Sequence, residues 1–161
     1  MKNFHNLCLE CMKELDVLNI QYGKISKWEI NTRAKKRWGQ CQSEGNGYYS
    51  ISISVRLLAD DIDDIATKTT ILHELLHTCE GCMNHGKEWQ RLADKVNRAC
   101  GYNIKRCTSC EEKGVEQVKA NYVIACPCCG TKWEYIRMTK AVQNPGRYRC
   151  GKCRKELVRI K

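Results

Sequence analysis

The spacing of apolar residues predicts three helices and a small sheet. Apolar side chains recur every three or four positions in residues 4–20, 61–79 and 86–100, as on one face of a helix. Between the first two helices the pattern changes to short strands, and in YYSISISV serine and isoleucine alternate. The turn residues SEGNG precede that strand. We therefore predict a small, mostly antiparallel sheet.

The regular pattern weakens after the third predicted helix. Residues 102–120 are polar and irregular, and from residue 121 short strand-like segments alternate with pairs of cysteines. The sequence thus predicts an α+β domain over residues 1–101, a linker over 102–120 and a C-terminal zinc ribbon over 121–161.

Composition narrows the class of protein. The chain has 161 residues, of which 42% are hydrophobic, and no stretch has the length of a membrane span. Because no apolar signal segment stands at the N-terminus, we expect a cytoplasmic protein without membrane partners, and a monomer. Thirteen cysteines in a reducing compartment indicate metal or thiol chemistry rather than a disulfide framework.

The positive charge is concentrated in the last third of the chain. The net charge is +10; residues 1–100 carry 14 basic and 13 acidic side chains, whereas residues 101–161 carry 14 and 5. A basic appendage is typical of proteins that bind nucleic acid. We therefore expect a nucleic acid as a partner, with association to the nucleoid if that nucleic acid is DNA. The alternative is a solvated basic tail.

A metal-binding pattern lies at the end of the second predicted helix. His73 and His77 form an HExxH motif around Glu74. Residues four apart leave the same face of a helix, so both imidazoles can reach one Zn²⁺. His85 follows after a loop and supplies a third ligand, which leaves an open position for a water. Glu74 is placed to take the proton of that water, as general base in attack on a peptide carbonyl.

Two cysteines interrupt this set of histidines. Cys79 and Cys82 form a CxxC between His77 and His85. Either thiolate can replace His85 as a ligand, which would close the site and leave Glu74 without a water to activate. We favour packing or loop-shaping roles for both cysteines. A thiol switch beside the metal is the remaining alternative.

Two further CxxC pairs near the C-terminus have the spacing of a structural zinc site. Their members are Cys126, Cys129, Cys150 and Cys153. Four thiolates at this spacing bind Zn²⁺ tetrahedrally, and glycine beside a ligand allows the positive φ that turns backbone N–H groups toward sulfur. Cys107 and Cys110 form a competing pair that lacks the following glycine, and Cys128 is the spare thiol of the first pair.

Basic and aromatic side chains are interleaved around these cysteines. This mixture suits phosphate contact together with stacking on single-stranded bases. The candidates are Lys132, Trp133, Arg137, Arg147, Arg149, Lys152 and Arg154. Alternatively, Trp133 and Tyr148 cover the small core of the ribbon. The basic run RAKKR at residues 33–37 is either a solvated face or a second binding patch.

The segment HELLHTCEGCMNHGKEW resembles the SprT-like metalloproteases, the group that includes Spartan. NTRAKKRWGQC, YYSISISV and the terminal ribbon extend the resemblance over roughly residues 4–155. It implies a zinc peptidase fold with zinc on His73, His77 and His85 and with Glu74 as general base. Substrate in such peptidases lies along an edge strand, for which YYSISISV is our candidate. Spartan-like members degrade proteins crosslinked to DNA, so the resemblance implies DNA, single-stranded or damaged, as a partner.

Together these patterns predict a zinc-dependent endopeptidase with one catalytic and one structural Zn²⁺, acting on DNA-bound or DNA-crosslinked proteins. Tyr48, Tyr49 and the arginines of RAKKR are candidates for stabilising the oxyanion. Two alternatives stay open. One is a nucleic-acid-binding zinc protein whose HExxH site is not catalytic. The other is a general peptidase without DNA coupling.

Overall fold

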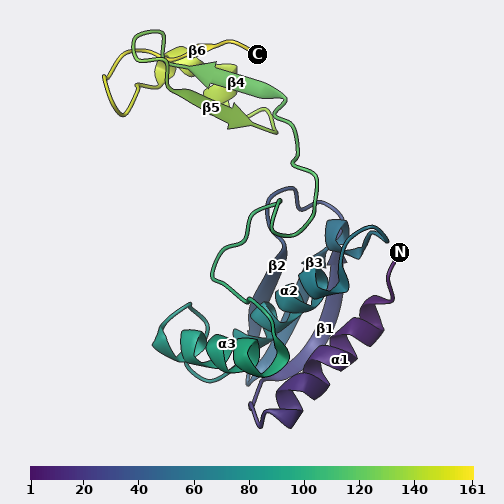
Figure 1. Cartoon of the computed structure of the whole chain (residues 1–161). Coiled ribbons are helices and arrows are strands. Elements are labelled where there is room, and N and C mark those ends of the chain that lie inside the picture. The colour runs from purple at the N-terminus through teal and green to yellow at the C-terminus, as the bar shows by residue number, and fades with distance from the viewer. The chain divides into compact units, whose positions relative to one another are not determined.

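The computed structural model describes all 161 residues and divides them into two compact units, residues 1–116 and 117–161 (Figure 1). The first unit contains three helices and a three-stranded sheet, and the second a smaller three-stranded sheet with short helical turns. The predicted α+β class is confirmed at this level. None of the helices combines the length and the apolarity needed to cross a bilayer.

The three long helices begin and end at residues suited to those positions. They are α1 (Phe4–Val17), α2 (Asp64–Leu76) and α3 (Lys87–Cys100). The Asp63 side chain caps α2 by accepting a hydrogen bond from the Ile65 backbone N–H, and Gly101 ends α3 with a left-handed φ of 71°. His77 is the first residue beyond α2 and keeps helical backbone angles. The side chains of His73 and His77 therefore leave the same face of the helix, one turn apart.

The sheet of the first unit is mixed. Its strands are β1 (Lys24–Asn31), β2 (Gly39–Gly45) and β3 (Tyr48–Ser54), in the order β1-β3-β2. The strand β3 is antiparallel to β2 but parallel to β1, so the prediction of a mostly antiparallel sheet is wrong for one of its two strand pairs. The period-two pattern revealed the faces of the strands but not their order, because alternation is the same in either direction.

The central position of β3 corrects a second prediction. YYSISISV is flanked by a strand on each side, so it has no free edge for a substrate. Its Ile51 and Ile53 are fully buried, and burial of this kind favours the strand with two neighbours. The free edges of the sheet belong to β1 and β2.

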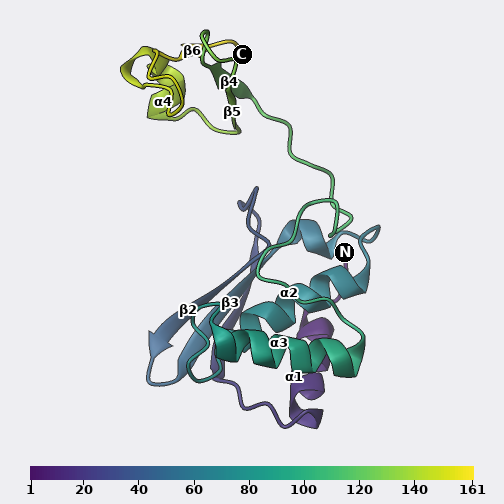
Figure 2. The ribbon, with the colours of Figure 1, turned by 60° about the vertical axis from the view of Figure 1, so that its left-hand side comes forward.

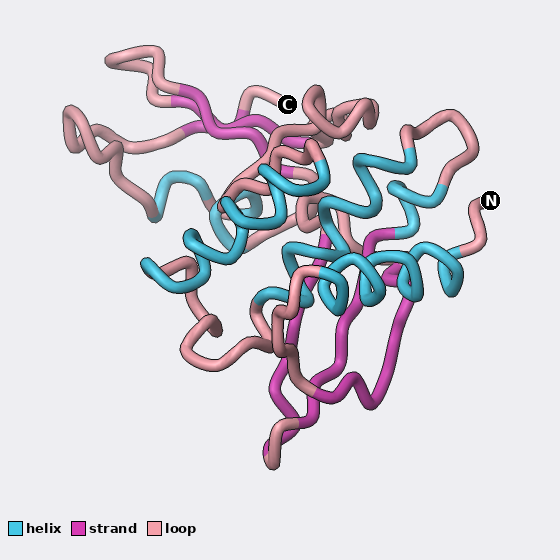
Figure 3. The backbone as a smooth tube through the Cα atoms, turned by 60° about the horizontal axis from the view of Figure 1, so that its bottom comes forward, coloured by secondary structure: helices cyan, strands magenta, loops and turns pink.

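All three helices lie on one face of this sheet (Figures 2 and 3). Isoleucines of β3 pack there against Leu72 and Leu75 of α2 and Trp89 of α3 in one continuous core. The opposite face carries polar side chains such as Gln42 and Ser50. The α2 helix, which carries the HExxH motif, is therefore held in place by packing against both the sheet and α3.

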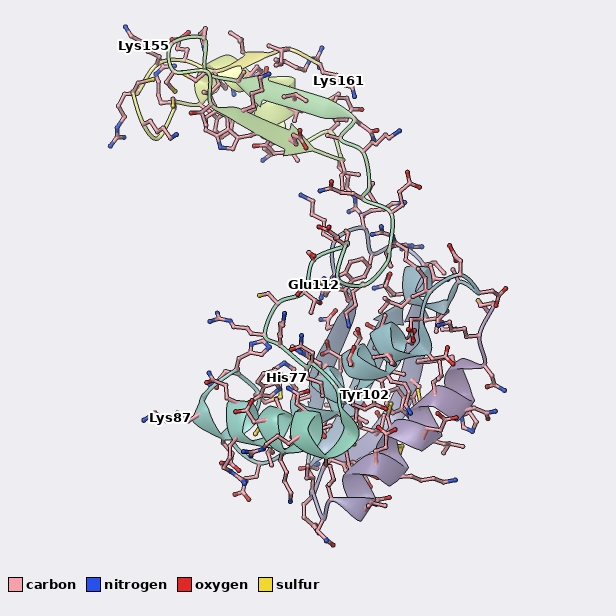
Figure 4. The ribbon with its side chains drawn as sticks, viewed as in Figure 1. His77, Lys87, Tyr102, Glu112, Lys155 and Lys161 are labelled. Carbon is pink, nitrogen blue, oxygen red and sulfur yellow. The ribbon has the colours of Figure 1, made fainter.

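Residues 102–116 belong to the first unit and are held there by hydrogen bonds, whereas the sequence predicted a linker over 102–120. Asn97 of α3 donates to the Ile104 carbonyl (3.1 Å) and accepts from its N–H (2.7 Å), and the Trp38 indole N–H donates to the Thr108 carbonyl (3.1 Å). Figure 4 labels Tyr102 and Glu112, which mark this segment. It has no periodicity to reveal its burial, because side chains rather than a regular ladder satisfy its backbone.

The second unit is a ribbon around a small core. Its strands are β4 (Tyr122–Ala125), β5 (Lys132–Tyr135) and β6 (Val158–Arg159), in the antiparallel order β5-β4-β6, with the turn α4 (Lys140–Gln143) alongside. Ile124, Val142 and Leu157 form the core together with Cys126 and Cys150. A core of this size is too small to fold on apolar burial alone, so a metal is expected to stabilise it.

The two cysteine turns of the ribbon share one backbone geometry. Gly130 follows Cys129 with a φ of 68° and donates its N–H to the Cys126 carbonyl (2.9 Å). In the second turn the equivalent residue is Arg154, with a φ of 63°, which donates to the Cys150 carbonyl (2.9 Å). A positive φ is unfavourable for arginine, so this turn carries strain that glycine would relieve.

Arg154→Gly should therefore raise the stability of the zinc-loaded protein by about 1 kcal/mol, because glycine adopts a positive φ without steric cost. Calorimetric melting of the ribbon at fixed zinc concentration measures this. Arg147→Gly removes the same charge from a residue with ordinary backbone angles and should lower stability. Equal destabilisation by both changes would contradict the account.

Candidate functional site

Three imidazoles converge in the first unit. His73 lies on α2, His77 directly follows it, and His85 lies on the loop before α3. Their Nε2 atoms are 2.9 Å (His73–His85), 3.2 Å (His73–His77) and 3.2 Å (His77–His85) apart. One helical turn and one loop thus bring together the three side chains that the sequence singled out.

Backbone carbonyls orient two of the three rings. Nδ1 of His73 lies 3.0 Å from the Lys105 carbonyl oxygen, and Nδ1 of His77 lies 2.7 Å from that of Cys82. Only a protonated Nδ1 can donate to a carbonyl, so Nε2 of each ring presents a lone pair. Burial and the neighbouring histidines lower the pKa of His73 to about 3, which keeps its imidazole neutral.

Trp89 forms an aromatic wall behind the histidines. Its ring centroid lies 4.8, 5.6 and 4.6 Å from those of His73, His77 and His85, stacked on His77 and edge-on to the other two. Trp89 is only 2% exposed and belongs to the hydrophobic core. The imidazoles are therefore braced by the core from one side.

The donor set fits Zn²⁺. Nitrogen lone pairs that converge at these distances repel one another unless a proton or a cation lies between them. Tetrahedral zinc with Zn–N bonds of about 2.0–2.1 Å separates its nitrogens by about 3.3 Å, close to the distances observed. Three protein ligands leave a fourth position open, as in catalytic zinc sites.

Glu74 lies beside this centre in a buried position. Desolvation raises the pKa of its carboxyl to about 7, opposed in part by a hydrogen bond from the Cys41 backbone and by the charge of Arg37. Gly39 of β2 makes room for it: a Cβ on Gly39 would stand 2.5 Å from a Glu74 carboxylate oxygen. The glycine of RWG therefore lets the sheet edge approach the motif helix closely.

A cavity of about 390 Å³ opens beside these groups. His73 and Glu74 line it, together with the last two residues of RAKKR and residues 103–108. Arg37 is one of its lining residues, whereas Tyr48 and Tyr49 lie elsewhere on β3. Of the oxyanion candidates that the sequence offered, only Arg37 is thus placed near the chemistry.

The second candidate metal site lies in the ribbon. Cys126 and Cys153 have their Sγ atoms 3.3 Å apart, Cys129 and Cys150 3.4 Å apart, and all four thiols lie within 4.8 Å of one another. These distances exceed a disulfide bond and suit four thiolates around Zn²⁺. A hydrogen bond with the Thr131 hydroxyl is the main cause that lowers the pKa of Cys129 to about 6.

Comparison with known proteins places the chain in a family. The family model for SprT-like proteins matches residues 4–108. The chain belongs to the SprT-like family. It is 34% identical over 95 residues to the "Protein SprT-like" of Bacillus subtilis (strain 168), and equally to that of Bacillus velezensis. Each match covers 56% of both chains, so this SprT-like chain spans a little over half the length of those relatives.

The remaining cysteines of the SprT-like chain lie outside both clusters. Cys79 and Cys82 are buried in the core, and burial raises the pKa of the Cys79 thiol to about 12. The Cys82 backbone carbonyl, not its thiol, contacts His77. Cys110 belongs to the first unit and is not a member of the ribbon cluster, and Cys107 lines the cavity. Loop shaping by Cys82 thus remains our interpretation.

The nucleic-acid candidates of the ribbon differ in their surroundings. Trp133 is half-buried against the ribbon core, whereas Tyr148 is 41% exposed. Arg149 forms an ion pair with Glu156 (2.8 Å). The other basic candidates are exposed and form no ion pair: Lys132, Arg137, Arg147, Lys152 and Arg154. Most of the predicted phosphate contacts are therefore free to bind a partner.

Sequence reasoning missed three residues of the site. Gly39 stands directly after RW in the sequence, which marks it as part of that motif. Only the structure shows that its missing side chain leaves space for the Glu74 carboxylate. Trp38 anchors the segment that covers the cavity. Lys113 is buried although it lies in a polar stretch, and no pattern in the sequence marks it.

The two clusters predict two bound Zn²⁺ per chain. His85→Ala should remove one and Cys150→Ala the other, whereas Cys128→Ala and Cys82→Ala should remove neither, because their thiols do not face a cluster. Elemental analysis of the purified variants, calibrated by native mass spectrometry, measures this. Loss of zinc in the Cys82 variant would show that a thiolate replaces an imidazole in the first site.

Proposed function

We propose that this SprT-like chain is a zinc-dependent endopeptidase that acts on DNA-bound or DNA-crosslinked proteins. The observation that carries the proposal is the position of Glu74, a buried carboxylate in the same cavity as His73. A purely structural zinc site needs neither a carboxylate there nor an open position. Here Glu74 provides the carboxylate, and a set of only three histidines leaves the fourth position open.

The residues of the chain divide the chemistry between them. Zn²⁺ held by the three imidazoles would supply Lewis acidity toward a water and a peptide carbonyl. Glu74 accepts the proton of the attacking water at a carboxylate oxygen and later delivers it to the leaving amide nitrogen. Its raised pKa, about 7, suits a group that must both take and release a proton near neutral pH.

The free edge of β2 is the position proposed for the substrate backbone. This strand has β3 on one side only, and its Gly39 lies against Glu74. An extended peptide that adds to an edge strand forms a regular set of backbone hydrogen bonds. Its scissile bond would then pass beside the Glu74 carboxylate. The sequence had given the role of substrate-binding strand to β3.

The charge of the ribbon supports the association with DNA. Residues 117–161 carry 11 basic and 2 acidic side chains, so nearly all the excess charge of the chain lies in 45 residues. Exposed basic side chains bind phosphate by releasing counterions, and an exposed aromatic such as Tyr148 can stack on a base.

Cleavage of a DNA-binding protein, with and without single-stranded DNA, tests the proposal. The zinc-loaded protein should cleave faster with DNA, and Glu74→Gln should lower the rate by at least about 100-fold, because the amide cannot accept a proton. DNA-independent cleavage would instead indicate a general peptidase. No cleavage by the zinc-loaded wild type would favour a binding protein.

Gly39→Ala tests the close approach of β2 to Glu74. The added methyl group must displace the carboxylate, so we expect kcat to fall by about 100-fold while zinc content stays unchanged. Gly146→Ala is the matched control, since a Cβ there meets no atom within 4 Å. Unaltered activity of the Gly39 variant would show that Glu74 does not need this position.

A further inference from the structure

The cavity beside Glu74 has an unusual charge balance. Among its lining residues Glu74 is the only carboxylate, whereas five side chains are basic. These are Lys36, Arg37, Lys105, Arg106 and Lys113. Because the first unit is nearly neutral as a whole, this excess is local and belongs to the cavity.

Lys113 is the most unusual of the five. Its side chain is buried, with 6% of the residue exposed, and no carboxylate forms an ion pair with it. Nζ donates to the Ala66 carbonyl and to the Thr69 hydroxyl, both at 2.8 Å, which leaves one of its three N–H bonds without a partner. Burial lowers the pKa of this amine to about 8. A cation in this position gains from a negative ligand that enters the cavity.

Two of the other four basic side chains have no partner and are available to such a ligand. Lys105 is paired with Glu112 at 2.7 Å and Arg37 donates to Gln40, but Lys36 and Arg106 form no ion pair. Both are exposed lining residues, so an anion that reaches Lys113 is also attracted by two unpaired cations of the same cavity.

The distance from Lys113 to the metal centre suits an amino-acid side chain. Thr69, which binds Lys113, and His73 are four residues apart on α2, so they lie about 6 Å apart along the helix axis. An extended glutamate side chain covers this length together with one hydrogen bond of about 2.8 Å to the amine, and aspartate is shorter by one methylene group. A backbone phosphate of DNA, held between two sugars, is too constrained to reach a lysine that is buried to this degree.

We propose that this cavity is a specificity pocket for an acidic side chain of the protein substrate, next to the bond that is cleaved, with Lys113 as its buried cation. The inference rests on the proposed peptidase function and names a substrate preference for it. Glutamate or aspartate at one fixed position from the scissile bond pairs with Lys113, and the exposed Arg106 adds to the attraction.

Cleavage of a mixed peptide library by the zinc-loaded full chain, with the cut sites identified by mass spectrometry, is the first experiment. Acidic residues should be enriched at one position relative to the cut. In a matched pair of peptides, glutamate at that position should give a kcat/KM at least about tenfold above glutamine. Cleavage without any acidic preference would overturn the pocket alone, whereas no cleavage of any peptide would overturn the peptidase as well.

Substitutions then test whether Lys113 causes the preference for an acidic side chain. Lys113→Met should bring the glutamate-to-glutamine ratio to within about twofold of one, and Lys113→Arg should retain most of it. The ratio is informative even if Lys113→Met lowers stability, since misfolding reduces both rates equally. Arg106→Met, at an exposed position, should lower the ratio about threefold. Lys119→Met, outside the cavity, should leave it unchanged. A Lys113→Met variant with the wild-type ratio would overturn the assignment.

Discussion

The convergence of three imidazoles is the constraint on which the rest of the first unit depends. Their Nε2 atoms lie within 3.2 Å of one another, a spacing that repulsion opposes unless a cation joins them. Three separate parts of the chain must be held in place to achieve this. The core fixes α2, the Cys82 carbonyl turns His77, and Trp89 of α3 supports all three rings. Metal binding in this fold therefore depends on the packing that positions the three imidazoles.

The approach of the sheet to the motif helix adds the chemistry. Gly39 permits β2 to lie against Glu74, which places a carboxylate with a raised pKa beside the metal centre and an edge strand beside both. Residues 102–116 complete the arrangement, because Lys105 orients His73 and Lys113 brings a cation into the cavity. The ribbon contributes a separate property, a dense positive charge around four thiols.

Much of this arrangement was predictable because it depends on local spacing. The three helices, the histidine triad and the grouping of the ribbon cysteines all follow from periodicity or from ligand intervals. What the sequence did not reveal depends on contacts between distant residues. The strand order places β3 in the centre, Lys113 is buried by side-chain hydrogen bonds, and Arg154 rather than Gly151 adopts the positive φ in the second cysteine turn. Polar segments of this kind carry no pattern that distinguishes a strap on the core from a linker.

Anomalous diffraction at the zinc edge, from crystals of the zinc-loaded protein, would reveal whether the three histidines hold an open zinc site. We expect a zinc peak about 2.0–2.1 Å from Nε2 of His73, His77 and His85, with a non-protein oxygen in the fourth position within hydrogen-bond reach of Glu74. A fourth ligand from the chain, whether a thiolate or the Glu74 carboxylate itself, would contradict this expectation, because the site would then be closed to substrate.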